Sequence, residues 1–208
     1  MSDSFDVVVI GAGPAGLMAA EMLCAAGHAV TVCEAKPSVG RKFLMAGKSG
    51  LNLTKDEGID DLLPQFAEAA NPMCEMLRAF DARSVQDWAR GLGQEVFTGS
   101  TGRVFPVAMK ASPLLRTWLA RLTAAGATFR TNMRWRGWDG QVAVFDGSAG
   151  REVIEADVTV LALGGASWAR LGSDGRWAEI LAAQGVALAP FAPANVGIEI
   201  AWSAHMLA

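Results

Sequence analysis

Three glycines and one carboxylate near the N-terminus have the spacing of a dinucleotide-binding site. Gly11, Gly13 and Gly16 follow a run of β-branched residues, and Glu34 stands at the end of a second buried-strand pattern. In such a pattern the first glycine permits a tight turn, the second lets the backbone approach a diphosphate, and the third lets helix and strand pack closely. A carboxylate at the position of Glu34 can accept hydrogen bonds from ribose hydroxyls and repels a 2′-phosphate. The spacing therefore predicts a dinucleotide site that favours a free adenosine ribose.

A strand, a helix and a second strand must position these residues. Residues 7–10 are β-branched without interruption, which is typical of a strand buried on both faces. A helix is expected to run toward Gly27, and Pro14 suits its first turn, where no intrahelical N–H bond is lost. Residues 29–33 predict the second strand. A diphosphate would lie at the helix N-terminus, where unpaired N–H groups and the positive end of the helix dipole face it.

Composition excludes several classes of protein. The chain has 208 residues and a net charge of −3, with 51% hydrophobic and 19% charged residues. This is the profile of a globular α/β protein, and the negative charge argues against nucleic acid as the main partner. The apolar stretches fall short of the roughly 20 residues that a membrane span needs, and residues 1–4 lack the basic start of a secretory signal. We expect a cytoplasmic protein with a small-molecule substrate; the sequence leaves its oligomeric state open.

Few side chains could serve as nucleophiles or metal ligands. Cys24, Cys33 and Cys74 are too scattered for a disulfide framework or a Cys-x-x-Cys pair, so we expect small core residues. His28 lies in the turn before the second strand and His205 near the last residue, so neither fits a catalytic triad or a metal cluster. A cofactor that carries its own chemistry fits this sequence better.

A cationic segment follows Glu34. Residues 36–55 show little periodicity and contain five cations and no acid. A charge run of this kind can be a solvated face. It can also be a loop of small residues that wraps around an anionic cofactor, and the position directly after Glu34 favours that interpretation.

The middle of the chain predicts short helices and strands. We expect a helical insertion over about residues 57–93, in which Asn71-Pro72 starts one helix and Ser84 caps another. Residues 94–105 predict two short strands around a turn. An amphipathic helix is expected over residues 112–126, capped by Ser-Pro and ended by glycine.

The next segment returns to strands. Residues 127–131 predict one strand, and three short alternating segments follow, turning near 139–140 and 146–150, which indicates an antiparallel meander. Residues 158–163 predict another continuous apolar strand, which ends in Gly164-Gly165. A plain NAD-binding domain would instead continue with helix-linked parallel strands.

These features resemble the glutathione-reductase-like FAD fold of flavoproteins with two dinucleotide-binding domains. Several motifs, in order along the whole chain, are similar to those of the HI0933-like (BaiN-type) NAD(P)/FAD-dependent oxidoreductases. The motifs are Gly40-Arg41-Lys42-Phe43-Leu44, Asn52-Leu53-Thr54, Gly102-Arg103-Val104-Phe105-Pro106-Val107, Leu163-Gly164-Gly165-Ala166-Ser167 and Gly172-Ser173-Asp174-Gly175. The resemblance implies an α/β fold over residues 1–208: a Rossmann-like FAD-binding domain with a parallel sheet, an antiparallel β-meander and an inserted helical segment.

The resemblance also implies a function. It implies an FAD-dependent oxidoreductase that transfers hydride between a nicotinamide cofactor and an unidentified small organic substrate, with NAD(P)H as the candidate reductant. Arg103 and Lys110 are candidates for charge near the flavin or ordinary surface cations, and no catalytic side chain is assigned. The cofactor-binding residues implied are Gly11, Gly13, Pro14, Ala15, Gly16, Glu34, Ala35, Lys36, Gly40, Arg41, Lys42, Asn52, Gly164 and Gly165.

The chain departs from the family pattern in three ways. Gly50-Leu51 stands where many members have Arg-Cys, and Ala162-Leu163-Gly164 where the closing strand often ends in Ala-Thr-Gly. Roles of that cysteine and threonine are therefore not carried over. Members continue well past Ala208, so we expect a fragment whose substrate-side region, from about residue 190, is incomplete. A non-catalytic or truncated FAD-binding module is the main alternative, and an NAD-dependent dehydrogenase is disfavoured by the meander.

Overall fold

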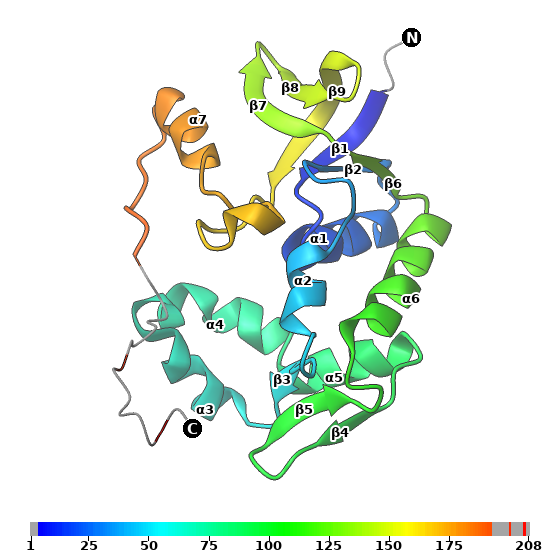
Figure 1. The fold of residues 1–208 in the computed structure, drawn as a ribbon, viewed down its shortest axis with the longest axis vertical. Helices are drawn as coiled ribbons and strands as arrows, with labels where there is room; N and C mark the ends of the chain where they lie inside the picture. Colours follow the sequence, from blue (N-terminus) through cyan, green and yellow to red (C-terminus); the bar gives the residue numbers. More distant parts are fainter. Residues whose placement is uncertain (1–3, 193–199, 201–205, 207–208) are drawn as a thin grey trace.

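The computed structural model describes residues 4–192, 200 and 206, and its main feature is a six-stranded sheet (Figure 1). The strands are β1 (Ser4–Ile10), β2 (Val30–Glu34), β6 (Thr128–Thr131), β7 (Arg134–Asp139), β8 (Val142–Gly147) and β9 (Gly150–Leu161). Their order across the sheet is β6-β2-β1-β9-β8-β7. The first four pair in parallel and the last three form an antiparallel meander. This mixed α/β architecture confirms the fold class expected from the sequence.

Helices cover the sheet and fill the segment between β2 and β6. They are α1 (Pro14–Ala25), α2 (Arg41–Ala46), α3 (Ile59–Leu62), η1 (Leu63–Ala69), α4 (Ala70–Ala79), α5 (Ala82–Gly91), α6 (Ala111–Ala124), η2 (Ala169–Leu171) and α7 (Trp177–Ala183). A second sheet of three strands, β3 (Thr54–Lys55), β4 (Val96–Thr98) and β5 (Arg103–Pro106), lies beside α5 in the lower part of Figure 1.

The β1–α1–β2 unit forms because its strands are apolar throughout and its turn is made of glycine. Residues 7–10 are all at most 3% exposed, and alternate residues enter different core clusters: Val7 and Val9 pack toward α1 and α6, whereas Val8 and Ile10 pack toward the meander. Successive side chains on a strand point to opposite faces, so β1 contributes to the core on both faces of the sheet. The helix begins at Pro14 with Gly13 as its N-cap, as expected.

Strand β9 differs from the expectation. We expected a third meander strand and a separate closing strand at 158–163, but residues 150–161 form one continuous strand. Its first part pairs antiparallel with β8, up to Ala143 opposite Ile154, and its second part pairs parallel with β1, from Ser4 opposite Glu155. The charged residues Glu155 and Asp157 interrupt the apolar pattern at the point where the pairing passes from one neighbour to the other, which is why the sequence suggested two elements.

Helix starts differ by one to three residues from those expected. Helix α5 begins at Ala82 with Asp81 as its N-cap, because the Asp81 carboxylate accepts a hydrogen bond from the Ser84 backbone N–H at 2.8 Å. Ser84 therefore lies within the first turn and is not the cap. Similarly, α4 starts at Ala70 and α6 at Ala111, in each case one residue before the expected dipeptide.

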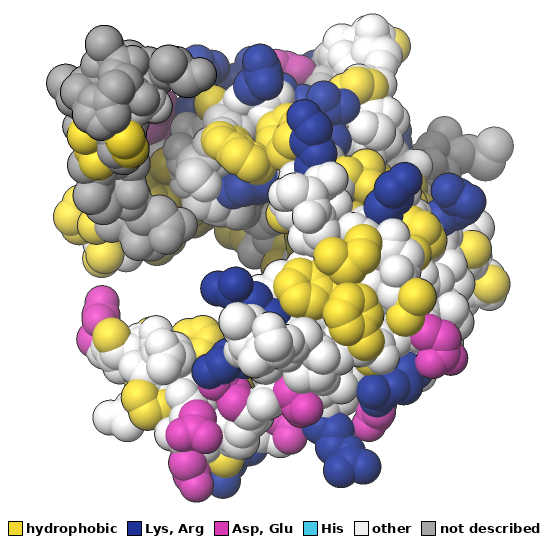
Figure 2. Space-filling model, turned by 60° about the horizontal axis from the view of Figure 1, so that its bottom comes forward, with side chains coloured by type: hydrophobic (Ala, Val, Ile, Leu, Met, Phe, Trp, Pro, Cys, Tyr) yellow, Lys and Arg dark blue, Asp and Glu magenta, His cyan; other side chains and the backbone are white. Residues whose placement is uncertain are grey.

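The surface carries charges of both signs with hydrophobic side chains between them, and a hollow indents the face shown in Figure 2. Large exposed hydrophobic side chains include Leu44, Met45 and Trp168. Within the described residues, no helix has the length and apolar character needed to cross a membrane.

Candidate functional site

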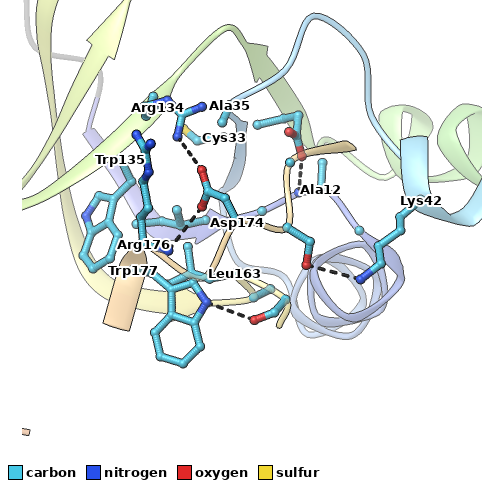
Figure 3. Close-up of a pocket in the computed structure, with 18 of the residues that line it drawn as sticks. Ala12, Cys33, Ala35, Lys42, Arg134, Trp135, Leu163, Asp174, Arg176 and Trp177 are labelled. Carbon is cyan, nitrogen blue, oxygen red and sulfur yellow. Dashed lines mark hydrogen bonds and ion pairs between the residues drawn. The ribbon is translucent and has the colours of Figure 1, made fainter. Parts of the chain in front are cut away.

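A cavity of about 690 Å³ lies at the carboxyl ends of β1 and β2. Its walls come from the N-terminus of α1, the start of α2, the start of β7, and the β9–α7 connection (residues 162–176) together with α7 (Figure 3). In open α/β sheets, ligands bind outside the carboxyl ends of the strands, and the volume is within the usual range for a small-molecule site. The cavity is therefore the candidate functional site.

The three glycines of the fingerprint have different reasons to be glycine. Gly11 has φ +108°, and a Cβ there would collide with the carbonyl oxygen of Ala162. A Cβ on Gly16 would collide with the carbonyl oxygen of Gly11. Gly13 is different: its φ is −83°, and a Cβ would meet no protein atom within 4 Å.

Gly13 lines the cavity, so the space beside its Cα is cavity space. The first N–H groups of a helix have no partner within the helix, and at the start of α1 they lie at this same wall. A backbone cradle that a side chain would fill, at the positive end of a helix dipole, fits a diphosphate.

Glu34 is engaged by the backbone. Its Oε2 accepts a hydrogen bond from the Ala12 N–H at 3.0 Å, and its Oε1 accepts one from the Lys36 N–H at 2.9 Å. The carboxylate thus fixes both the β1–α1 turn and the start of the cationic segment. Each carboxylate oxygen has a further acceptor site, so a ribose hydroxyl can still donate to Glu34.

Part of the cationic segment lies at the cavity. Gly40 adopts φ +64° as the N-cap of α2 and donates its N–H to the Ala12 carbonyl at 2.9 Å. This bond ties α2 to the glycine turn and places Arg41 and Lys42 in the cavity wall. Lys55, in contrast, lies on β3 outside the cavity wall and forms an ion pair with Glu57.

Apart from Gly164, sequence reasoning missed the far wall of the cavity. Arg134, at the start of β7, forms an ion pair with Asp174 of the β9–α7 connection, with 3.3 Å between Nη1 and Oδ2 (Figure 3). Trp177 begins α7 and donates its indole N–H to the Gly164 carbonyl at 3.0 Å. The motif at residues 172–175 was visible in the sequence, but only the meander folding back beside β9 shows that it meets Arg134.

Two ionisable groups in the cavity wall, Asp174 and Cys33, have shifted pKa values. Partial burial of Asp174 raises its pKa, but hydrogen bonds from the Arg176 N–H and from Arg134, with the charges of both arginines, outweigh this and hold the pKa below its usual value. For Cys33, burial raises the thiol pKa to about 12, although the charge of Arg130 opposes the increase. The Cys33 thiol therefore stays protonated near neutral pH and is no nucleophile.

Most of the expected cofactor-binding residues surround the cavity. Those in its wall are Gly11, Gly13, Pro14, Ala15, Glu34, Ala35, Gly40, Arg41, Lys42 and Gly164. Gly16 packs behind the turn, Lys36 contributes its backbone N–H to Glu34, and the Gly165 carbonyl accepts a bond from Ser173.

The other expected residues lie on the surface. Asn52 is exposed just before β3, away from the residues that line the cavity. Arg103, on β5, and Lys110, before α6, are exposed as well. The expected substrate-side region from about residue 190 falls largely outside the described residues.

Comparison with known proteins shows the family to which the chain belongs. A family model described as the HI0933-like protein Rossmann domain matches residues 5–205. The chain belongs to this family. The membership confirms the resemblance drawn from the motifs and supports the class of FAD-dependent oxidoreductases.

Individual relatives add detail. The chain is 28% identical over 200 residues to the 3-dehydro-bile acid delta(4,6)-reductase of Clostridium scindens, covering 92% of this chain and 47% of that protein. It therefore spans about half the length of this curated relative.

Solved structures of other enzymes share the fold. A flavocytochrome c3 fumarate reductase matches with TM-score 0.59 and 23% identity, over 79% of this chain and 34% of that one. The 3-ketosteroid-delta4-(5alpha)-dehydrogenase of Rhodococcus jostii RHA1 matches with TM-score 0.57 and 18% identity, over 79% and 47%. At these identities the likeness shows the fold alone.

Proposed function

We propose that this chain binds FAD in the cavity and is the dinucleotide-binding part of a flavin-dependent oxidoreductase. One observation carries the proposal: Gly13 faces open cavity space at the N-terminus of α1, with a conformation that any residue could adopt. The protein's own packing does not require glycine there, whereas a bound diphosphate does. The family membership supports FAD as the dinucleotide.

The residues of the cavity divide the binding between them. The N–H groups at the start of α1 would hold the diphosphate, and Arg41 and Lys42 would offset its negative charge. Glu34 would accept bonds from the adenosine ribose, which FMN lacks. When bound, FAD supplies hydride transfer, while the protein orients it and limits its contact with water.

The finer parts of the proposal concern the reaction partners. We propose that NAD(P)H reduces the flavin and that the reduced flavin passes hydride to a small organic substrate, in the cytoplasm. The bile acid reductase, which this chain matches over about half of that enzyme's length, supports a reductive role. An NAD-dependent dehydrogenase is disfavoured because the chain turns into an antiparallel meander after β6.

A pair of glycine variants tests FAD binding. Gly13→Val would fill the diphosphate cradle, so we expect FAD affinity to fall at least about tenfold, the factor that corresponds to about 1.4 kcal/mol. Gly58→Val is the matched control: Gly58 is also an extended helix N-cap with no atom within 4 Å of a Cβ, and it lies outside the cavity wall. Flavin titration of both folded proteins measures the effect. Equal FAD affinity in the two variants would remove the basis of the proposal.

A cofactor assay separates the alternatives. Acid release followed by chromatography identifies the bound nucleotide, and recovery of NAD alone would favour the dehydrogenase. Anaerobic addition of NADH or NADPH to the FAD complex then tests the reductant through bleaching of the flavin absorbance. A flavin that binds but is not reduced by either would favour a non-catalytic FAD-binding module.

A further inference from the structure

The β9–α7 connection is joined to two other parts of the cavity wall, α2 and β7. It carries the motif Gly172-Ser173-Asp174-Gly175, to which the proposed function gives no role. It lines the cavity with several of its residues and leads directly into α7. Its side-chain contacts reach two other parts of the fold, α2 and β7.

The first contact is to Lys42 of α2. The Lys42 Nζ donates to the Ser173 hydroxyl at 3.2 Å (Figure 3). It also donates to the Ser167 hydroxyl at 2.9 Å. Ser173 is only 5% exposed and donates its own hydroxyl to the Gly165 carbonyl at 2.9 Å. A lysine ammonium has three donors, so two of them are used to hold the connection.

The second contact is the ion pair between Arg134 and Asp174. The Asp174 carboxylate also accepts the Arg176 N–H at 3.3 Å, which orients it toward β7. The Arg134 and Asp174 side chains are 37% and 23% exposed. Partly exposed pairs of this kind are weak and can break and re-form readily.

The four residues Lys42, Ser173, Arg134 and Asp174 line the cavity, whereas Ser167 does not. The Lys42–Ser173 contact therefore joins the connection to α2, and the Arg134–Asp174 contact joins it to β7 within the far wall, so both hold the connection where the ligand would bind. Gly172, next to Ser173 in the chain, lies close to the residues at the end of β2: a Cβ there would be 3.3 Å from the Cγ of Lys36 and 3.9 Å from the Glu34 Oε1.

The connection also holds a strained residue. Trp168 is 55% exposed and has φ +64°, a left-handed conformation that is unfavourable for a bulky side chain. Such strain persists only where surrounding contacts enforce it, and it is often found in segments that change conformation. Here the neighbouring contact is the one between Ser167 and Lys42.

We propose that the β9–α7 connection is a strap, held closed by the Lys42–Ser173 and Arg134–Asp174 contacts, that opens to admit and release the dinucleotide. The identity of the ligand rests on the proposed function, but the opening does not. If opening precedes entry, weakening either contact accelerates association as well as dissociation. If a contact merely stabilises the bound state, weakening it would accelerate dissociation alone.

Two variants weaken the contacts without removing a cation. Ser173→Ala removes the buried acceptor of Lys42, and Asp174→Asn removes the charge opposite Arg134. Asp139→Asn is the matched control, because Asp139 forms an ion pair with Arg151 in the meander, at 2.6 Å and outside the cavity wall. We expect both strap variants to raise the FAD association rate, measured by stopped flow, about two- to fivefold, and the control to leave it unchanged.

Hydrogen exchange tests the strap without any ligand. In both strap variants the amides of residues 164–175 should exchange at least about twofold faster, while those of β1 stay as in the wild type. Association rates that are unchanged or lowered, or unchanged exchange of residues 164–175, would overturn the proposal. If the wild type binds no FAD, the proposed function fails, and the exchange measurement alone decides whether the strap exists.

Discussion

At the scale of single residues, the Glu34 carboxylate connects three parts of the chain. It stands at the end of β2, and its two oxygens accept the N–H groups of Ala12, in the glycine turn, and of Lys36, in the cationic segment. The sequence pattern predicted a contact to ribose only. The structure adds a second role, in which Glu34 holds the turn in its binding conformation before any ligand arrives.

This second role predicts a loss of stability in the ligand-free protein. Glu34→Ala leaves two backbone N–H groups without their charged acceptor, so we expect the free energy of unfolding to fall by about 1.5–3 kcal/mol. Glu34→Gln keeps one carbonyl acceptor and should lose less. Urea unfolding without flavin measures the series, with the exposed Glu75→Ala as control. If Glu34→Ala is as stable as the wild type, the carboxylate serves only the ligand.

At the scale of secondary-structure elements, a partly buried polar contact holds helix α1 in place. The Glu21 carboxylate accepts the indole N–H of Trp118 at 2.6 Å and that of Trp88 at 3.2 Å, and it pairs with Arg121 at 2.5 Å. The two indole rings meet edge to face, with 4.8 Å between their centroids. One carboxylate thus connects α1 to α5 and α6, and it sets the direction of the helix whose N-terminus forms the cavity wall.

Removing this carboxylate should loosen the contact between the helices. Glu21→Ala leaves two largely buried indole N–H groups and one guanidinium without an acceptor, and we expect the free energy of unfolding to fall by about 2–4 kcal/mol. Denaturant unfolding monitored by tryptophan fluorescence measures the change, and Glu75→Ala on α4 again serves as control. A loss no larger than that of the control would mean that packing alone positions α1.

The elements themselves were largely predictable from local patterns. The β1–α1–β2 unit was predictable because buried strands and glycine turns are encoded by neighbouring residues. Helix caps were less predictable, because Asp81 and Ser84 are both residue types that favour the N-cap position. Only the structure shows that the Asp81 carboxylate accepts a hydrogen bond from the Ser84 N–H. The continuity of β9 depends on a change of pairing partner, which is a tertiary property with no local signal.

At the scale of the whole molecule, one wall of the site could be predicted from the sequence and most of the other could not. The fingerprint wall is contiguous in sequence apart from Glu34 and the segment after it, so spacing alone brings its residues together. The facing wall joins Arg134 to Asp174, forty residues apart, through the fold-back of the meander. No periodicity relates these two residues, and Glu21 with its distant tryptophans was missed for the same reason.

The extent of ligand contact along the fingerprint wall should be visible in the thermal stability of the whole chain. A ligand that binds only the folded state at 100 times its dissociation constant adds about 2.7 kcal/mol. In a chain of this length that raises the unfolding midpoint by about 5–11 °C. We expect such an increase with FAD, because it can reach both the start of α1 and Glu34. FMN has no adenosine for Glu34 to hold, and at the same concentration it should raise the midpoint by less than about 2 °C.

A thermal unfolding series with FAD, FMN and NADH at one concentration measures this order. Gly13→Val is the control, since a tenfold loss of affinity should reduce the FAD increment by about half or more while leaving the midpoint without ligand close to that of the wild type. Equal increments for FAD and FMN would show that the adenosine half of the site contributes nothing, and Glu34 would then act on the turn alone. A larger increment for NADH than for FAD would assign the cavity to a nicotinamide dinucleotide, because the diphosphate cradle and the Glu34 carboxylate can hold either one.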